Sequence, residues 1–265
     1  MSVVTDSVSY VYAVGREVPV GSLDDLTGVA GREVAAVAGS GLQALVSTVP
    51  LEDFSGEKLE ERLQDLTWLA ETARAHHHVV DTVGRAAALV PLALATVFYD
   101  EARVRAVLEE RGAEFTRALD DLDGRAEFGV KVYLPTGAAP GAGEKGTAEK
   151  GTGEKGAGRT TGTEYLRRRR AAVGAAERAM RSARESADAL HDVASEAAVR
   201  SRRHRVHDTA LTGRTDQMVL NGAYLVDRAR SGEWRAAVDR AAPGEVTVEI
   251  TGPWIPYSFV NGEDG

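Results

Sequence analysis

The sequence has no cysteine among its 265 residues, which excludes disulfide bonds, thiol nucleophiles and cysteine-ligated zinc or iron–sulfur sites. It also has no apolar run long enough to cross a bilayer, because the longest uncharged one, residues 86–99, is short and contains Pro91. Before the first apolar stretch the chain carries an acidic residue and no basic one, which is atypical of a secretory signal. We therefore expect a cytoplasmic protein.

Basic residues are in the minority, with 32 lysines and arginines against 40 acidic residues and a formal net charge of -8. This balance argues against non-specific nucleic-acid binding as the main role. What is present is ordinary for a soluble globular protein, at 43% hydrophobic and 27% charged residues. The length is sufficient for two domains, each with its own core.

Catalytic motifs are missing as well, since the chain contains no P-loop, HExxH or GxSxG pattern. Two matches to the dinucleotide-binding glycine fingerprint lie within low-complexity sequence at 141–156, without the strand and helix that such a site needs. The acidic clusters at 109–110 and 120–123 are typical of solvated helix surfaces. We therefore predict no catalytic or cofactor-binding residues and no cofactor.

A histidine cluster, His76-His77-His78 with Asp81, raises the question of a metal site. Successive residues of a helix point about 100° apart, so the three imidazoles cannot converge on one ion. Only His77 and Asp81 share a face, and two ligands rarely suffice. We predict no metal-binding residues and interpret these histidines as packed or solvated.

Residues 1–134 are predicted to form an α+β domain. The run 8–14 (VSYVYAV) predicts the first strand, and two further strand-like runs flank Gly39-Ser40-Gly41 as a hairpin. Apolar residues recur every three or four positions across 57–85 and predict one long amphipathic helix. Residues 90–134 then show the pattern of a strand–helix–strand unit, with an apolar strand at 90–99, a helix from Asp100 to Gly124 and an alternating strand up to Leu134.

Residues 135–162 repeat the pattern x-x-Glu-Lys-Gly three times and contain no large apolar side chain. Such a segment cannot bury enough surface to offset its ordering entropy, so we predict a flexible linker between domains.

Residues 163–265 are predicted to hold a long helix followed by a second α+β layer. The helix is expected from 163 to about 208, and the layer is predicted from a strand at 218–226, a helix at 232–241 and a strand at 245–251. Small and apolar residues recur along the helix every seventh position and form a coiled-coil-like seam. Its partner is either the helix at 57–85 or a helix of another protein. The two rows of the seam are Leu166, Val173, Met180, Ala187 and Ala194, and Ala176, Ala183, Leu190 and Ala197.

Several stretches resemble the gas vesicle GvpF/GvpL family, in the same order and at similar separations. They are YVYAV near the N-terminus, VPLALATVFYDEARVRAVLEER, EFGVKVYL, MVLNGAYLVDR and the closing GPWIPYSFV, and they cover nearly the whole chain outside the linker. One departure is Ala93, where the family usually has a basic residue after Pro91-Leu92.

The resemblance implies a two-domain α+β protein with a ferredoxin-like C-terminal domain and an added long helix. It also implies an accessory protein of gas vesicle assembly that binds the hydrophobic shell protein and other accessory proteins, located in the cytoplasm and on the gas vesicle. Binding of nucleic acid and a membrane span are not expected. The alternatives are a helical oligomerisation scaffold and an enzyme whose active site carries no motif. In the closing segment, Trp254, Tyr257 and Phe259 are interpreted mainly as aromatics that seal the C-terminal core, and secondarily as partner contacts.

Overall fold

A computed structural model describes residues 7–19, 21–54, 56–135, 162–206 and 216–260. By their internal contacts they divide into two units. The first unit comprises residues 1–127, 227–229 and 252–265, and the second comprises 128–226 and 230–251. The division of the chain at 134 and 163 stays a prediction, and residues 136–161 of the predicted linker lie outside the described residues.

The first unit is built on an antiparallel sheet. Its strands β1 (Ser7–Gly15), β2 (Ala35–Gly39), β3 (Leu42–Pro50) and β4 (Leu89–Pro91) lie in the order β2-β3-β1-β4, and β5 (Val97–Phe98) also pairs with β1. The predicted first strand and the predicted hairpin are both confirmed. Ser40 and Gly41 form the hairpin turn, and both have a positive φ, as a two-residue turn between right-twisted strands requires.

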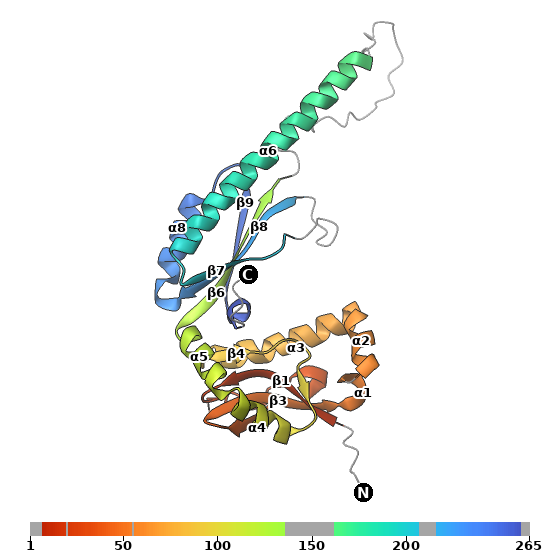
Figure 1. Ribbon diagram of the computed structural model, residues 1–265, viewed down its shortest axis with the longest axis vertical. Helices are drawn as coiled ribbons and strands as arrows, with labels where there is room; N and C mark the ends of the chain where they lie inside the picture. The colour runs from red at the N-terminus through yellow and green to blue at the C-terminus, as the bar shows by residue number, and fades with distance from the viewer. Residues whose placement is uncertain (1–6, 20, 55, 136–161, 207–215, 261–265) are drawn as a thin grey trace. The chain divides into compact units, whose positions relative to one another are not determined.

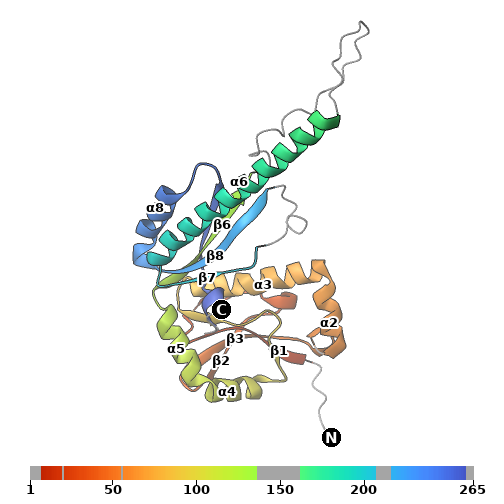
Figure 2. The same cartoon turned by 45° about the horizontal axis from the view of Figure 1, so that its top comes forward.

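Helices cover both faces of this sheet, as Figures 1 and 2 show: α3 (Leu66–Gly84) lies on one face and α4 (Glu101–Glu110) on the other. The short helices α1 (Leu51–Phe54) and α2 (Gly56–Gln64) precede α3, and α5 (Gly112–Leu122) follows α4. A 3-10 turn, η1 (Val29–Gly31), lies between β1 and β2. The core beneath α3 contains Tyr10, Tyr12, Leu45, Phe54, Val79, Val80, Val83 and Ile255.

Two helices predicted as continuous are each broken in two. The helix expected at 57–85 is interrupted at Asp65, whose carboxylate accepts hydrogen bonds from the backbone N–H groups of Thr67 and Trp68 and so begins α3. The helix expected from Asp100 is interrupted at Arg111, which has φ -110° and ψ 12° and separates α4 from α5. Its predicted apolar stripe is nevertheless buried, with Val104, Val107, Leu108, Phe115, Leu119 and Leu122 in the core.

The predicted strand at 90–99 is wrong. Only Leu89–Pro91 and Val97–Phe98 are extended, and a turn between them is closed by the N–H of Thr96, which donates to the carbonyl of Ala93. Pro91 has no N–H to continue a ladder, and Ala95 adopts a positive φ of 62°. Both short strands pair with β1, so the apolar run still contributes to the first sheet.

The second unit has the order β6 (Arg125–Leu134), α6 (Gly162–Glu196), β7 (Arg200–Arg203), β8 (Gln217–Asp227), α8 (Ser231–Ala241) and β9 (Thr247–Trp254). Its sheet order, β7-β8-β6-β9, together with this β-α-β-β-α-β succession, is the ferredoxin-like arrangement. The α+β fold class is therefore confirmed. Two short 3-10 turns, η2 (Arg228–Arg230) and η3 (Tyr257–Phe259), follow β8 and β9.

Two predictions for this region need correction. Strand β6 alternates as predicted, with Phe128, Val130 and Val132 buried, but it pairs in the second sheet, so residues 90–134 do not form one strand–helix–strand unit. The long helix ends at Glu196 rather than near 208, because residues 200–203 pair with β8 as a strand. Trp234 of α8 anchors this unit: its side chain is 1% exposed, and its indole N–H donates to the carbonyl of Ala194 at 2.9 Å.

Candidate functional site

The edge strand β2 of the first sheet lacks the features that usually prevent an edge from pairing with another chain. Within the described residues it pairs with β3 alone. Its sequence, AAVAG, has no charge and no proline, and the side chains of Ala35, Ala36 and Ala38 are exposed. Edge strands in soluble proteins commonly carry lysine, proline or a bulge to block strand addition. Strand β2 therefore offers a backbone edge shielded only by methyl groups.

The hairpin register fixes which backbone groups face outward. Gly39 and Leu42 close the two-residue turn and form the first pair of the ladder, and in such a hairpin this pair exchanges both of its backbone hydrogen bonds. Every second pair along the strands then does the same, and the pairs between them are not hydrogen-bonded to each other. Ala36 and Ala38 fall on the alternate positions, with their N–H and C=O groups directed away from β3. Outside the ladder, no backbone hydrogen bond between described residues involves either one.

A groove lies beside this edge on the sheet face that carries α4. It has a volume of about 680 Å³ and runs between the end of β3 and the start of α4. Ala35 and Val46, which are paired across β2 and β3, form part of its floor. The remaining lining is mixed in polarity and comprises Ser7, Gly31, Arg32, Glu33, Thr48, Val49, Pro50 and Glu101.

The second sheet provides a contrast, because its edge strand β7 has the sequence RSRR. One of these side chains, Arg203, donates to the carboxylate of Asp188 at 2.7 Å. Charged side chains held along an edge oppose the approach of another strand. Of these two edges, β2 and β7, only β2 is free of charged side chains.

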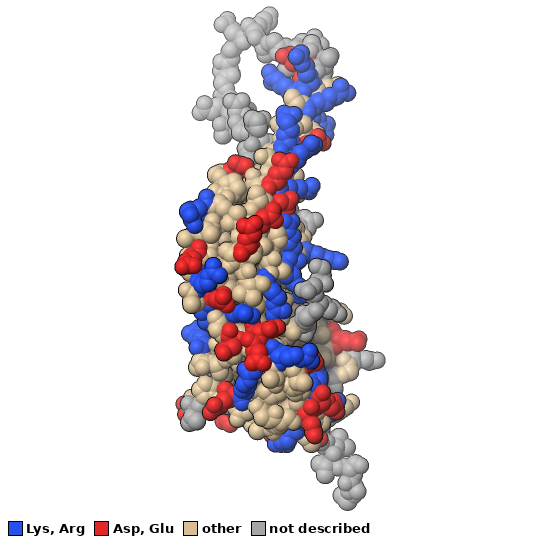
Figure 3. All heavy atoms as spheres, turned by 60° about the vertical axis from the view of Figure 1, so that its left-hand side comes forward, with Lys and Arg blue, Asp and Glu red and all other residues tan. Residues whose placement is uncertain are grey.

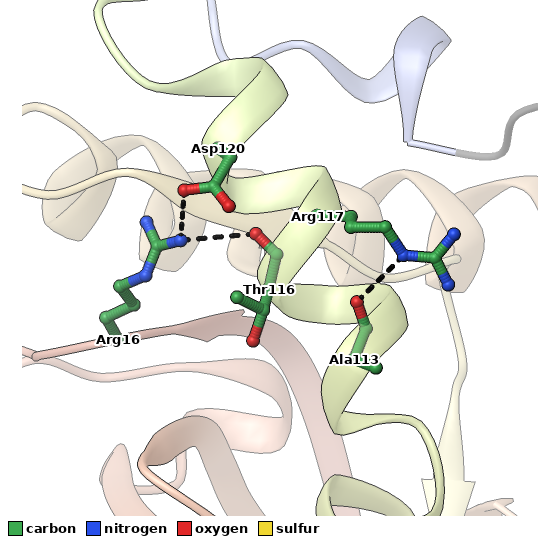
Figure 4. A network of polar contacts seen from close by, with 5 residues as sticks. All are labelled: Arg16, Ala113, Thr116, Arg117 and Asp120. Carbon is green, nitrogen blue, oxygen red and sulfur yellow. Dashed lines mark hydrogen bonds and ion pairs between the residues drawn. The ribbon is translucent and has the colours of Figure 1, made fainter.

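The helical layer beside the groove is fixed to the sheet by a small polar network, shown in Figure 4. The guanidinium of Arg16, just beyond β1, donates to the carboxylate of Asp120 at 2.5 Å and to the backbone carbonyl of Thr116 at 3.2 Å, both on α5. Asp120 belongs to the acidic cluster predicted to be solvated, and its side chain is 66% exposed. It therefore acts as a surface tether.

Beneath the opposite face lies a buried group of rings around His76. The hydroxyl of Tyr10 lies 2.9 Å from Nδ1 of His76, and the hydroxyl of Tyr12 donates to Ser47 Oγ at 2.8 Å. Burial, followed by the nearby charge of His77, lowers the pKa of His76 to about 4. Burial likewise raises the pKa of Tyr10 and of Tyr12. These groups are neutral near pH 7 and serve as packed, hydrogen-bonded rings.

The histidine cluster diverges in the way the helical geometry predicts. His76 points into the core, His77 lies against Trp254 and Tyr257 at ring distances of 5.9 Å, and His78 is exposed. Asp81, the other suggested ligand, pairs with Arg85 at 2.5 Å. Across the part of the chain that the structure describes, no three histidine or acidic side chains are grouped as metal ligands would be.

The closing GPWIPYSF segment, residues 252–259, is anchored to the first unit. A Cβ on Gly84 of α3 would lie 2.4 Å from Cδ1 of Ile255, which shows how closely the segment packs on that helix. The carboxylate of Glu127 accepts hydrogen bonds from the N–H and the hydroxyl of Ser258. Of the three aromatics, Phe259 is buried, Tyr257 is half-buried and Trp254 is 43% exposed.

Comparison with known proteins identifies the family. The family model described as "Gas vesicle synthesis protein GvpL/GvpF" matches residues 8–261. The chain belongs to the GvpL/GvpF family. Gas vesicle protein L of Streptomyces sp. (strain CB03234) is 40% identical over 255 residues, covering 96% of this chain and 93% of that protein.

More distant relatives agree with this assignment. Gas vesicle protein F of Haloferax mediterranei is 25% identical over 241 residues, covering 89% of this chain and 86% of that protein. The crystal structure of GvpF from Anabaena sp. PCC7120 superimposes with a TM-score of 0.66 at 16% identity, covering 97% of both chains, and shows that the fold is shared. This GvpL/GvpF protein is therefore a protein of gas vesicle formation. Among the described helices, none combines the length and apolarity that crossing a membrane requires.

Sequence reasoning did not single out the edge of β2. The only signal was the lack of charge from Val34 to Val46, and this became informative once the pairing placed β2 at the end of its sheet. Ala93 is exposed in the turn between β4 and β5.

Proposed function

We propose that this GvpL/GvpF protein binds the hydrophobic gas vesicle shell protein and helps to nucleate or chaperone shell formation in the cytoplasm, with some copies retained on the vesicle. The observation that carries the proposal is the exposed, uncharged edge of β2. An apolar segment of the shell protein would add to β2 as a further strand, with the outward N–H and C=O groups of Ala36 and Ala38 as its backbone partners.

Two features support this mode of binding. Pairing of backbone groups provides affinity without requiring a particular side-chain sequence, and the groove beside Ala35 and Val46 offers space for side chains of the added strand. A strand that is bound in this way cannot pair with other copies of the shell protein, so binding would limit premature aggregation. Release at a growing shell edge would then supply subunits in an extended form.

The test is co-expression of the shell protein with this chain, followed by measurement of soluble shell protein and of its co-purification. The wild type is expected to raise both. Ala36→Lys introduces a charge at the edge, and Ala38→Pro removes an outward N–H without removing a bond to β3. Each should reduce co-purification severalfold, Ala36→Lys because the charge opposes an apolar strand, and Ala38→Pro because one lost hydrogen bond corresponds to about 1 kcal/mol.

Ala113→Lys, at an exposed position of α5, is the matched control because it adds the same charge away from the edge. Thermal denaturation establishes that each variant is folded. If the folded edge variants retain as much shell protein as the control, binding through β2 is wrong. If the wild type itself changes neither the solubility nor the recovery of the shell protein, the proposed function is wrong.

A further inference from the structure

The long helix α6 buries its small-residue seam in one half and exposes it in the other. Ala183, Ala187, Leu190 and Ala194 are each at most 1% exposed, and α8 packs against this half of the helix. Leu166 and Val173 belong to the same heptad pattern, and each is 53% exposed. The packing pattern therefore continues for about four turns beyond the part that is buried.

The exposed part of the seam is hollowed. A groove of about 310 Å³ is lined by Leu166, Val173 and Gly174 together with Arg169, Arg170 and Glu177. Leu166 and Val173 are seven residues apart and lie almost directly above each other on a helix. Gly174 has no side chain to fill the space beside Val173. Leu166 and Val173 thus form an exposed apolar stripe on one face of α6, next to Gly174.

Charge distinguishes this half of α6 from the rest of the chain. Between residues 162 and 184 there are seven arginines and two glutamates, a net charge of +5 in a protein whose total is -8. Figure 3 shows basic side chains gathered at this end of α6 and acidic ones further along it. Within the described residues, no ion pair engages the arginines at 167–170.

This arrangement is unfavourable for an isolated helix. Arg167 and Arg170 are three residues apart, as are Arg178, Arg181 and Arg184, and like charges at this spacing destabilise a helix by a few tenths of a kcal/mol per pair. This penalty is relieved when acidic side chains lie alongside, so the charges complement an acidic partner.

We infer that the N-terminal half of α6 is a docking face for an acidic amphipathic helix of a partner protein. Its apolar residues would cover Leu166 and Val173, and its carboxylates would pair with the flanking arginines. A second copy of α6 fits poorly, because it would bring +5 against +5. The segment at 136–161 fits poorly as well, because it contains no large apolar side chain. This inference is independent of the proposed binding of the shell protein, because it concerns α6 of the second unit and an acidic helix, whereas the proposed function concerns β2 of the first unit and an apolar strand.

The test uses the full-length protein and synthetic helical peptides of about three heptads, with leucine on the seam and glutamate beside it. A second peptide carries lysine in place of glutamate. Fluorescence anisotropy should show saturable binding of the acidic peptide, weakened by salt, and at least about tenfold weaker binding of the basic one. Equal binding of both peptides, or of neither, would overturn the inference.

Variants locate the site. The double variant Leu166→Ser/Val173→Ser should weaken binding of the acidic peptide about tenfold or more, while Leu66→Ser, which alters a 79% exposed leucine of the first unit, should leave it unchanged. Because the altered side chains are exposed, folding should be retained, and circular dichroism checks this. Unchanged binding by the folded double variant would place the peptide elsewhere. Light scattering that shows a dimer lost in the double variant would assign the face to a second copy instead.

Discussion

Acid should destabilise the first unit through His76, whose side chain is 3% exposed and lies among Tyr10, Tyr12 and Tyr257. Burial and the charge of His77 lower its pKa from the ordinary 6.5 to about 4. In the pH range between these values the unfolded chain binds a proton that the folded chain does not. Stability therefore falls as the pH falls through this range, and is fully present above about pH 6.5.

The size of this effect follows from the two pKa values. The pKa of His76 is 6.5 in the unfolded chain and about 4 in the folded protein. This difference predicts that protonation of His76 alone lowers the free energy of unfolding by about 2 kcal/mol between about pH 7 and about pH 5. The variant His76→Phe keeps a ring of similar size but cannot be protonated. It should cost about 1 kcal/mol near pH 7, because the hydrogen bond with Tyr10 is lost.

The assay is urea denaturation of wild type and variant at a series of pH values. Between about pH 7 and about pH 5, the free energy of unfolding of the wild type should fall by about 2 kcal/mol more than that of His76→Phe. The two plots of unfolding free energy against pH should therefore approach or cross. His78→Gln, at an exposed position of the same helix, is the control and should follow the wild type. Parallel curves for wild type and His76→Phe would refute the reasoning, because they would mean that His76 binds protons equally in the folded and unfolded states.

Three further substitutions probe other contacts by the same denaturation measurement. Trp234→Ala should destabilise the second unit by about 3–5 kcal/mol through the cavity it leaves, and a loss below 1 kcal/mol would contradict the central position of that ring. Gly28→Ala should cost about 1–3 kcal/mol or more, since its Cβ would lie 2.1 Å from the anchored hydroxyl of Tyr12, and a neutral result would contradict this packing. Arg16→Ala should cost at most about 1 kcal/mol, because its bridge to Asp120 is solvated, and a larger loss would show a structural role for the network of Figure 4.

Much of the fold follows from local pattern. The β-branched and aromatic run at 8–14 predicted β1, alternation predicted β6, and the glycines around Ser40 predicted the hairpin between β2 and β3. These features depend on neighbouring residues along the chain, so the sequence contains them directly. Helix breaks were harder to predict: Asp65 interrupts a periodic pattern with no neighbouring proline or glycine, and Gly112, which follows the break at Arg111, is of a type tolerated inside many helices.

Pairing between distant segments could not be predicted in the same way. The alternation of β6 states which of its side chains are buried but not which sheet it joins, and it joins the second. In α3 the buried histidine is His76, and the sequence alone left open which of the three adjacent histidines is packed and which is solvated. The candidate site could not be predicted for the same reason, because β2 is an edge strand only as a result of the order in which the strands of its sheet pair.

Amide hydrogen exchange of β2 in the complex tests the central claim most directly. The chain would be co-purified with the shell protein, and exchange within residues 35–39 compared with that of the chain alone. We predict slower exchange at Ala36 and Ala38, whose N–H groups face outward in the free protein, with little change in β7. Protection confined to other segments, or none at all in a complex that retains the shell protein, would contradict strand addition at β2.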